Sequence, residues 1–429
     1  MTHIVVYATY EIIIVAYTTV SRQASVILGR IMGQKREKIP SGVWAIGFVS
    51  LFMDASSELV HALLPALYLS LGVNMAAVGI IEGIAEATAA ITKVFSGALS
   101  DWLGKRKLLT IIGYGLAALT KPLFPLANSV AVLFTARVID RIGKGIRGAP
   151  RDALIADITP QTVRGAAYGL RQSLDAAGGF IGPILALSLM AIFSNDITLS
   201  LWFAVIPAVL CMVFLVFGVK EPDNVVSSRA AGKKKGLPLN RADISQLNGR
   251  YWVVVVIGAL FSLARFSVAF LALRAMELGL PIGLSPLVLI LMGVVYSLSS
   301  YPVGILADRV DRGKLLALGF VSLIVAELLL AYTLDFRVAF VGVAFWGLHL
   351  GLTQGLLSAL VADAAPVHLR GTAFGIFNLA NGVALLLASL VAGALWQTLG
   401  PSMTFYVGAG FASTALVMLL ISLRSKHWG

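Results

Sequence analysis

Long apolar runs alternate with short polar segments through most of this chain. From about residue 43 to residue 423, mostly apolar runs of about 20 residues are each followed by a few polar or charged residues. A helix of that length crosses the hydrocarbon core of a bilayer, and only a helix satisfies its own backbone hydrogen bonds there. The pattern predicts an all-α membrane protein with twelve transmembrane helices, approximately at residues 43–71, 75–98, 107–126, 129–144, 165–193, 200–219, 251–273, 285–306, 314–333, 338–360, 371–396 and 402–423.

The composition agrees with that pattern. Hydrophobic residues make up 58% of the chain and charged residues only 13%, against about 25% charged in an ordinary soluble domain. The net charge of +12 does not indicate nucleic acid, because the basic residues fall in alternate loops instead of on one soluble face. The single cysteine, Cys211, lies in an apolar run, so we expect a core residue and no intramolecular disulfide.

The chain repeats itself once. The segment from Gly97 to Lys107 is similar to the segment from Gly304 to Lys314, and each directly follows a long apolar run. A second motif, which contains Asp157, recurs around Asp363, 206 residues later. Repetition on this scale in an apolar chain is typical of transporters built from parallel repeats, with the binding site between them. We therefore expect two six-helix bundles.

A polar stretch separates the two halves. Residues 220–250 have the composition of a solvated linker, which divides the first bundle at residues 41–219 from the second at residues 251–429. Basic residues are concentrated in this linker and in the loops on the same side of the predicted spans. By the positive-inside bias, we expect a multi-pass protein of the cell (inner) membrane with both termini in the cytoplasm.

Residues 1–40 form a separate N-terminal extension. Its apolar part, residues 4–20, contains Glu11 and is too short and too polar for a thirteenth span. No basic residue precedes it and no clear small-residue cleavage site follows it, unlike a signal peptide. We interpret the extension as disordered or interfacial, or as the product of an upstream start, with Met32 the natural start.

The repeated loop resembles the signature of the major facilitator superfamily. That signature reads approximately G-x-L-a-D-r-x-G-r-k between the second and third spans. The first copy departs from it at Trp102, and the second at Asp311, where the family usually has glycine. The matching positions are Gly97, Asp101, Gly104, Arg106, Gly304, Asp308 and Arg312. The resemblance covers the chain from about residue 41 and implies two bundles that rock about a central binding site.

Packing and charge give this loop a physical role. A glycine at the end of a span, as at Gly97 and Gly304, lets two helices approach closely. Asp101 can accept from backbone N–H groups at the start of another helix, and Arg106 can pair with a nearby carboxylate. By the resemblance, such a latch closes the cytoplasmic side in the outward-open state. The alternative is a turn whose charges only fix the orientation of the chain.

The predicted fifth span carries a second resemblance. Gly169, Gly178, Gly182 and Pro183 fit the pattern G-x8-G-x3-G-P of proton-driven antiporters in the superfamily, although residues 186–187 replace the usual final pair of glycines. Glycine and proline in a membrane helix also serve as packing and kink positions without any coupling role. Both interpretations are open.

Three ionisable residues lie on one face of the first predicted span. Asp54, Glu58 and His61 are spaced i, i+4 and i+7. A charge at the bilayer centre costs about 2.5 to 3.5 kcal/mol on insertion scales, so these groups must face a cavity or meet partners. They are the first choice for protonation or cation binding. The alternatives are a structural role for the acids, a hydrogen-bonded histidine, and a divalent metal site.

Other predicted spans supply charged partners for that face. They are Glu82, Glu86, Arg137, Asp140, Arg141, Arg171, Asp175 and Arg265. The pKa of a buried carboxyl group depends on desolvation and on nearby arginines, so a conformational change that alters either one moves a proton. Alternatively, Arg171 and Asp175 neutralise one another at i, i+4 spacing, as do the arginines on either side of Asp140.

Two further groups of polar residues have open roles. The segment from Asp140 to Asp152 is dense in charge. We interpret it either as a second latch around Asp157 and Arg164 or as a vestibule that attracts anions. In the second half, uncharged polar groups suit substrate hydrogen bonding or contacts between helices, and these are His349, Thr353, Gln354, Asn378 and Asn381.

These patterns favour a secondary active transporter that works by alternating access. The leading hypothesis is proton-coupled efflux of a small organic compound by a monomer surrounded by lipids, without a cofactor. Proton-coupled uptake of an anionic solute and divalent metal efflux are the alternatives within transport. A non-transporting membrane receptor or scaffold is a different class. An enzyme is disfavoured, because no nucleophile and base stand at a recognisable spacing and no phosphate-binding Gly-Lys-Ser/Thr occurs.

Overall fold

The computed structural model describes residues 38–103, 105–219, 244–307, 310–366 and 369–424, which are helical and contain no strand. The first half comprises α2 (Ser41–Ser70), α3 (Met75–Leu103), α4 (Arg106–Thr120), η1 (Lys121–Leu123), α5 (Val130–Ile158), η2 (Gln161–Val163), α6 (Arg164–Ile192), α7 (Ile197–Trp202) and α8 (Val205–Gly218). The second half comprises α11 (Gly249–Leu263), α12 (Ala269–Glu277), η3 (Ile282–Leu284), α13 (Pro286–Ala307), α14 (Arg312–Tyr332), α15 (Phe336–Ala364), α16 (Arg370–Leu399) and α17 (Pro401–Arg424).

These helices follow the predicted spans in order, and the all-α membrane class is confirmed. Among the described residues, nine helical segments are long and apolar enough to cross a membrane. Of the other predicted spans, α4, α11 and α12 are shorter helices, and α5 is long but rich in charge. α5 continues to Ile158, well past the predicted end at residue 144. The predicted sixth span is divided into α7 and α8, and the seventh into α11 and α12.

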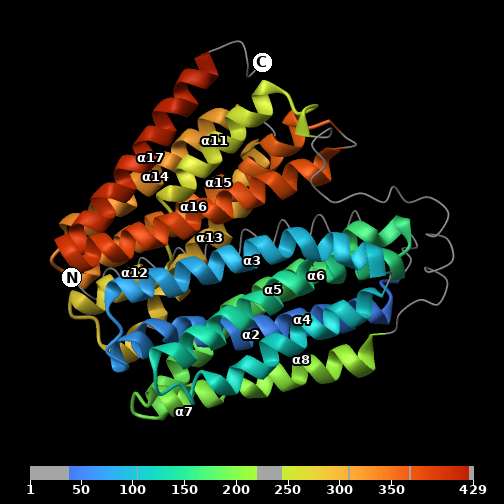
Figure 1. Cartoon of the computed structure of the whole chain (residues 1–429), viewed down its shortest axis with the longest axis horizontal. Helices are drawn as coiled ribbons and strands as arrows, with labels where there is room; N and C mark the ends of the chain where they lie inside the picture. The colour runs from blue at the N-terminus through green and yellow to red at the C-terminus, as the bar shows by residue number, and fades with distance from the viewer. Residues whose placement is uncertain (1–37, 104, 220–243, 308–309, 367–368, 425–429) are drawn as a thin grey trace.

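Figure 1 shows the two halves of the chain as separate groups of helices. We name the first half, blue to green, the N bundle (residues 41–219) and the second, yellow to red, the C bundle (residues 249–424). The bundles meet at the end where α3 begins and α16 ends, which we name the joined end. They diverge toward the end where α8 ends and α11 begins. The diverging end is the one that the sequence predicts to be cytoplasmic.

Small residues let the bundles touch at the joined end. A Cβ atom added at Gly79 of α3 would lie 2.3 Å from the backbone oxygen of Ser389 and 3.0 Å from the Cα atom of Gly393, both on α16. The two helices therefore pack backbone against backbone. The amide N–H of Met75 also donates to the Gln397 side chain at 3.1 Å. This end of the molecule is closed by direct contact between the bundles.

Replacing Gly79 with alanine is expected to weaken this closure. The added methyl group meets backbone atoms, which cannot rotate away, so α3 and α16 must separate at a cost of about 1 to 3 kcal/mol. Gly410→Ala in α17 is the matched control, because no heavy atom lies within 4 Å of an added Cβ there and alanine favours a helix. The unfolding temperature should fall in the first variant only. Equal changes in both would contradict the packing.

Close packing of α6 on α2 positions the site described below. A Cβ atom at Gly178 would lie 2.3 Å from the backbone oxygen of Leu51, and one at Gly182 would meet the backbone of the same helix, α2. Gly169 has nothing within 4 Å. The packing role of two of the predicted motif glycines is therefore visible in the structure. Their contact brings Asp54 of α2 close to α6.

Several sequence predictions fall outside the described residues. They concern the N-terminal extension up to residue 37, most of the linker, Gly104 and Asp308. The side chain of Asp101 is likewise outside the described part. The latch predicted for the repeated loop therefore rests on Arg106 and Arg312.

Candidate functional site

Asp54 is held by partners from two other helices. Its Oδ1 atom lies 3.3 Å from Nη2 of Arg147 on α5, and its carboxyl group is close enough to that of Asp175 on α6 for electrostatic interaction. Two neighbouring carboxylates repel one another when both are ionised, which favours a proton on one of them. We name Asp54 and Asp175 the carboxyl pair. It is a place in the N bundle where a proton can reside.

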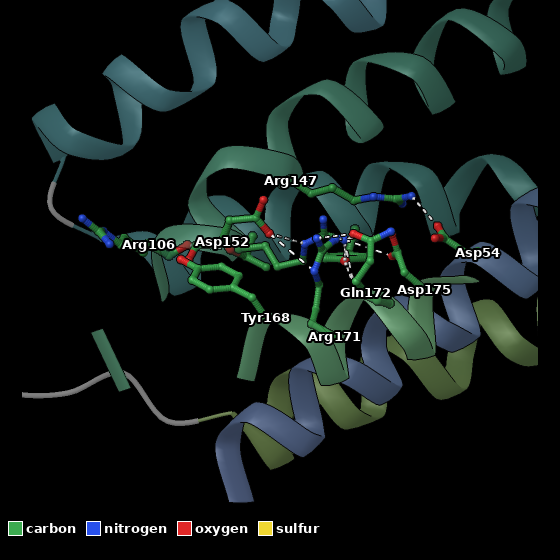
Figure 2. A network of polar contacts seen from close by, with 12 residues as sticks. Asp54, Arg106, Arg147, Asp152, Tyr168, Arg171, Gln172 and Asp175 are labelled. Atoms are coloured by element: carbon green, nitrogen blue, oxygen red, sulfur yellow. Dashed lines mark hydrogen bonds and ion pairs between the residues drawn. The ribbon is translucent and has the colours of Figure 1, made fainter. Parts of the chain in front are cut away.

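Three arginines surround the carboxyl pair, as Figure 2 shows in part. Besides Arg147, Arg151 Nη1 lies 3.4 Å from Asp175 Oδ1, and Arg171 Nη1 lies 3.3 Å from Asp175 Oδ2. Asp152 completes the network, with its Oδ1 atom 3.1 Å from Arg151 Nε. When its three aspartates are all ionised, the network is neutral. One added proton leaves one positive charge without a counter-charge.

A second buried cluster joins α3, α5 and the C bundle. Glu82 accepts from Arg137 Nε at 3.0 Å and Nη2 at 2.8 Å, and from the Tyr68 hydroxyl at 2.6 Å. The Glu82 and Arg137 side chains are 1% and 2% exposed. Ser267, between α11 and α12, donates to the same carboxylate at 2.9 Å. The Glu82 cluster (Tyr68, Glu82, Arg137 and Ser267) therefore links the two bundles.

Lys121 is a buried cation that the sequence analysis did not assign to the site. It follows α4 at the end of a span, a position typical of a surface lysine, yet its side chain is 1% exposed. Its ammonium group lies 2.8 Å from Asp140 Oδ1 and 3.0 Å from Ser57 Oγ. A flexible four-carbon side chain can carry the charge inward from a helix end. The only indication in the sequence was that Asp140, within a predicted span, requires a cationic partner.

Arg137 and Arg141 of α5 pair with α3 and not with Asp140. Arg137 binds Glu82, as described above, and Arg141 Nη1 lies 3.4 Å from Glu86 Oε1. The alternative in which these charges neutralise one another within α5 is wrong, because their side chains reach the neighbouring helix. The i, i+4 pair of Arg171 and Asp175 does form, but Asp175 also belongs to the carboxyl pair.

The three ionisable residues of α2 separate into two arrangements. Glu58 Oε2 lies 3.2 Å from His61 Nδ1, within the same helix. Asp54 meets Arg147 and Asp175 instead. In the part of the chain that the structure describes, no three His, Cys, Asp or Glu side chains are grouped as metal ligands. The geometry gives no support to a divalent metal site on this face.

A cavity of about 230 Å³, which we name the central cavity, lies between the bundles. Polar side chains of α3 and α5 face those of α16 across it, and they are Glu86, Lys93, Arg141, Lys144, Asn378 and Asn381. A second cavity of about 330 Å³ lies in the C bundle, where Tyr296 donates to Gln354 at 3.0 Å. The two cavities give the molecule internal space for a small solute.

Of the five uncharged polar residues predicted for the C bundle, three line cavities and two are buried in the core. Asn378 and Asn381 line the central cavity, and Gln354 lines the second cavity. His349 and Thr353 are fully buried, and the Thr353 hydroxyl donates to the backbone oxygen of His349 at 2.8 Å. This hydrogen bond lies within α15, whereas Gln354 and Asn381 accept hydrogen bonds from other helices. A contact between helices is therefore observed for these two cavity residues, and the role of the cavity residues as substrate ligands stays a prediction.

Charge is concentrated in the N bundle. In the C bundle, Arg265 lies in the break between α11 and α12, with its guanidinium 5.9 Å from the centre of the Phe261 ring. Glu327 is fully buried in α14. Neither residue forms an ion pair with another described residue. The two halves share a fold but not their internal chemistry.

Comparison with known proteins agrees with this architecture. The family model for the Major Facilitator Superfamily matches residues 44–384 and 254–428. An uncharacterised MFS-type transporter of Methanocaldococcus jannaschii is 31% identical over 391 residues, which are 89% of this chain and 95% of that protein. This chain belongs to the major facilitator superfamily. As a superfamily member it is a multi-pass membrane transporter.

Two further superfamily proteins extend the comparison. The class E tetracycline resistance protein of Escherichia coli is 26% identical over 392 residues, which are 87% of this chain and 93% of that protein. The crystal structure of the nucleoside transporter NupG aligns with a TM-score of 0.71 at 14% identity, and covers 90% of this chain and 99% of NupG. At that identity the structural likeness concerns the fold.

The superfamily loop brings two equivalent ion pairs to the diverging end. Arg106 Nη1 lies 2.9 Å from Asp157 Oδ2 and joins α4 to α5. Arg312 Nη1 lies 2.7 Å from Asp363 Oδ2 and joins α14 to α15. Each residue of the second pair stands 206 positions after its counterpart. The repeat in the sequence is therefore also a repeat of contacts.

Burial predicts unequal effects for these two pairs. The Arg106 and Asp157 side chains are 9% and 11% exposed, whereas Arg312 and Asp363 are 37% and 49% exposed. Asp363→Asn should lower the free energy of unfolding by at most about 1 kcal/mol, as for other surface pairs. Asp157→Asn should cost several times more, because it leaves a largely desolvated arginine without that carboxylate. Thermal unfolding of the two variants checks this, and equal losses would contradict it.

Proposed function

We propose that this superfamily member is a proton-coupled secondary active transporter of the inner membrane, which exports a small organic compound by alternating access. The carboxyl pair carries the proposal. Two aspartates from different helices lie within range of electrostatic interaction in a membrane-spanning bundle, among three arginines. Ionisable groups at that depth mark ion pathways and proton relays. A proton moved through the pair supplies the driving force.

Proton binding acts through the charge balance of the network. With one proton on the carboxyl pair, the three arginines exceed the two remaining carboxylates by one charge. An unbalanced charge is costly in a medium of low dielectric constant. The protonated network therefore favours the arrangement of the bundles in which that charge reaches water or an anionic partner. A proton taken up on one side of the membrane and released on the other therefore shifts the population of the two arrangements.

Some contacts between the bundles must break, and others must form, during transport. At the joined end, rocking of the bundles must break the Ser267–Glu82 hydrogen bond and separate α3 from α16. At the diverging end, the loops that carry the Arg106 and Arg312 ion pairs would then approach one another. The basic loops of that end support its location in the cytoplasm, with both termini on the same side. With this topology, we infer an inward-open arrangement, because the joined end then faces away from the cytoplasm.

Export is the direction that the relatives support. One relative is named a tetracycline resistance protein, and a transporter gives resistance when it removes a compound. The glycines and proline from Gly178 to Pro183 agree with this direction through their resemblance to the antiporter pattern, although two of them also pack against α2.

Proton-coupled uptake of an anionic solute is the second candidate. It is favoured by the cationic side chains of the central cavity, because a proton and an anion that move together carry no net charge. Direction of transport separates the two candidates.

A transport assay tests the proposal. Host cells without their own drug exporters are loaded with a panel of fluorescent drugs and organic acids, with and without the protein. Export predicts lower accumulation in cells that contain the protein, and a protonophore should remove the difference. Higher accumulation would assign uptake. If no compound of the panel moved and reconstituted vesicles showed no proton flux, proton-coupled transport would be contradicted.

A further inference from the structure

The central cavity is built from the middle of three helices. Lys93 and Glu86 lie in the middle third of α3, Lys144 is central in α5, and Asn381 is central in α16. In transporters built from repeats, the substrate binds near the bilayer midplane at the interface of the repeats. The cavity therefore occupies the position at which such a substrate binds.

The wall of the central cavity has an excess of positive charge. Lys93, Arg141 and Lys144 face a single carboxylate, Glu86, which is already paired with Arg141. Among the described residues, neither lysine forms an ion pair, although Lys144 is close enough to Glu86 and Glu58 for electrostatic interaction. Arg141 is 4% exposed, and its Nε–H has no acceptor in the described chain. The wall therefore carries two more positive than negative charges.

The amides on the opposite wall add hydrogen-bond donors. Asn381 Oδ1 accepts from the Ser262 hydroxyl at 3.2 Å, which leaves its NH₂ group to donate. Three residues beyond Ser262, Arg265 is a further cation without a carboxylate partner among the described residues. Neutral amide donors of the C bundle thus face the charged side chains of the N bundle across the cavity.

We propose that the central cavity binds the anionic group, a carboxylate, phosphonate or sulfonate, of a small organic solute. This inference rests on the proposed transport function and names its substrate class for either direction of transport. Lys93 and Lys144 supply charge from the N bundle, and the Asn381 amide donates from the C bundle, so the solute bridges the two. Ala89, Ala90 and Leu385 leave an apolar wall for the body of the solute. At about 230 Å³ the cavity suits a compact compound.

An anionic lipid headgroup shares this chemistry. The cavity lies at the middle of the helices, whereas headgroups lie at the bilayer surface, about 15 Å from the midplane of a 30 Å hydrocarbon core. The position therefore favours a free solute over a lipid.

A binding experiment with matched probes tests the inference. The full-length protein, purified in a neutral detergent, is titrated at millimolar concentration with benzoate, phenylphosphonate and benzenesulfonate, with uncharged benzamide, and with cationic benzylamine. At least one anion should raise the unfolding temperature, and benzamide and benzylamine should not. Lys93→Gln combined with Lys144→Gln should weaken binding of that anion by about tenfold or more, because each lost charge pair contributes on the order of a kcal/mol.

Lys314→Gln is the control variant, because this exposed lysine at the start of α14 is not part of the cavity wall. It should bind the anion as the unsubstituted protein does. Absence of stabilisation by any anion, equal stabilisation by benzamide or benzylamine, or unchanged binding in the double lysine variant would overturn the inference. Displacement of the anion by phosphatidylglycerol, with the same lysine dependence, would assign the cavity to a lipid and also overturn it. Proton flux in reconstituted vesicles would report separately on the transport function.

Discussion

Replacing both aspartates of the carboxyl pair with asparagine will abolish proton-driven accumulation while substrate exchange continues. Asparagine keeps the size of aspartate but cannot bind or release a proton. Exchange of substrate for substrate across the membrane needs no net proton movement, so the Asp54→Asn and Asp175→Asn double variant should retain it. Coupling between two sites is typically worth about 1 to 3 kcal/mol, or 5- to 150-fold. We expect the accumulation ratio to fall toward one, a loss of about 100-fold in coupling.

Reconstituted vesicles with an imposed pH gradient provide the measurement, with any compound that moves in the cell assay. Asp196→Asn is the matched control, because Asp196 is exposed and caps α7, a role that asparagine fills equally well. It should accumulate substrate as the unsubstituted protein does. Full proton-driven accumulation in the carboxyl-pair variant would rule out the pair as the coupling site. Loss of exchange as well as accumulation would show that the aspartates serve substrate movement itself.

Glu82→Gln will destabilise the protein more than the same substitution at Glu86. Glutamine fills the space of glutamate but leaves the Arg137 guanidinium, which is 2% exposed, without its counter-charge. Removing one partner of a buried pair costs about 3 to 5 kcal/mol. The Glu86 side chain is 35% exposed, so Arg141 can gain water when Glu86 is replaced. The unfolding temperature of the purified protein should therefore fall much further for Glu82→Gln.

A double-mutant cycle separates pairing from simple loss of packing. Arg137→Met removes the charge that Glu82→Gln leaves unpaired, so the double variant should be more stable than the Glu82→Gln variant alone. If the losses of the two single variants simply added, the buried pair would not be the source of the effect.

Much of the fold is predictable from this sequence because the bilayer imposes a simple rule. Apolar runs of sufficient length become helices, and the repeated loop divides them into two similar halves. The rule fails for α5. Its sequence loses apolar character near residue 144, where we predicted the helix to end, yet the helix continues to Ile158. The helix continues because Arg147 and Arg151 point inward and find carboxylates on α2 and α6. Hydropathy does not register charges that are paired inside the protein.

The sequence identified many residues of the candidate site, but it did not show which of them pair with one another. Helical spacing placed Asp54 and Glu58 on one face, and the cost of burying charge selected Glu82 and Arg137 as candidates. Spacing within one helix carries no information about which helices are neighbours, so the pairing of Asp54 with Asp175 could not be read from it. Lys121 was missed for a related reason, because its place at a helix end hides the inward direction of its side chain.

Buried charged pairs are distributed unequally between the two bundles, and we infer that the bundles have different roles in transport. The described part of the N bundle contains the carboxyl pair, the Glu82–Arg137 pair and the Lys121–Asp140 pair. The C bundle contributes Ser267 to one cluster and amides to the central cavity. On this account the N bundle carries the proton, and the C bundle responds through contacts that form and break at the interface.

Paired distance measurements on spin-labelled protein test alternating access driven by the carboxyl pair most directly. Labels at Leu108 and Lys314 report on the diverging end, and labels at Leu126 and Tyr332 on the joined end, with each pair at equivalent positions 206 residues apart. On a change of pH, one distance should lengthen while the other shortens, and the Asp54→Asn and Asp175→Asn double variant should lose this response. Distances that change in the same sense, or a response that persists in the double variant, would contradict the account.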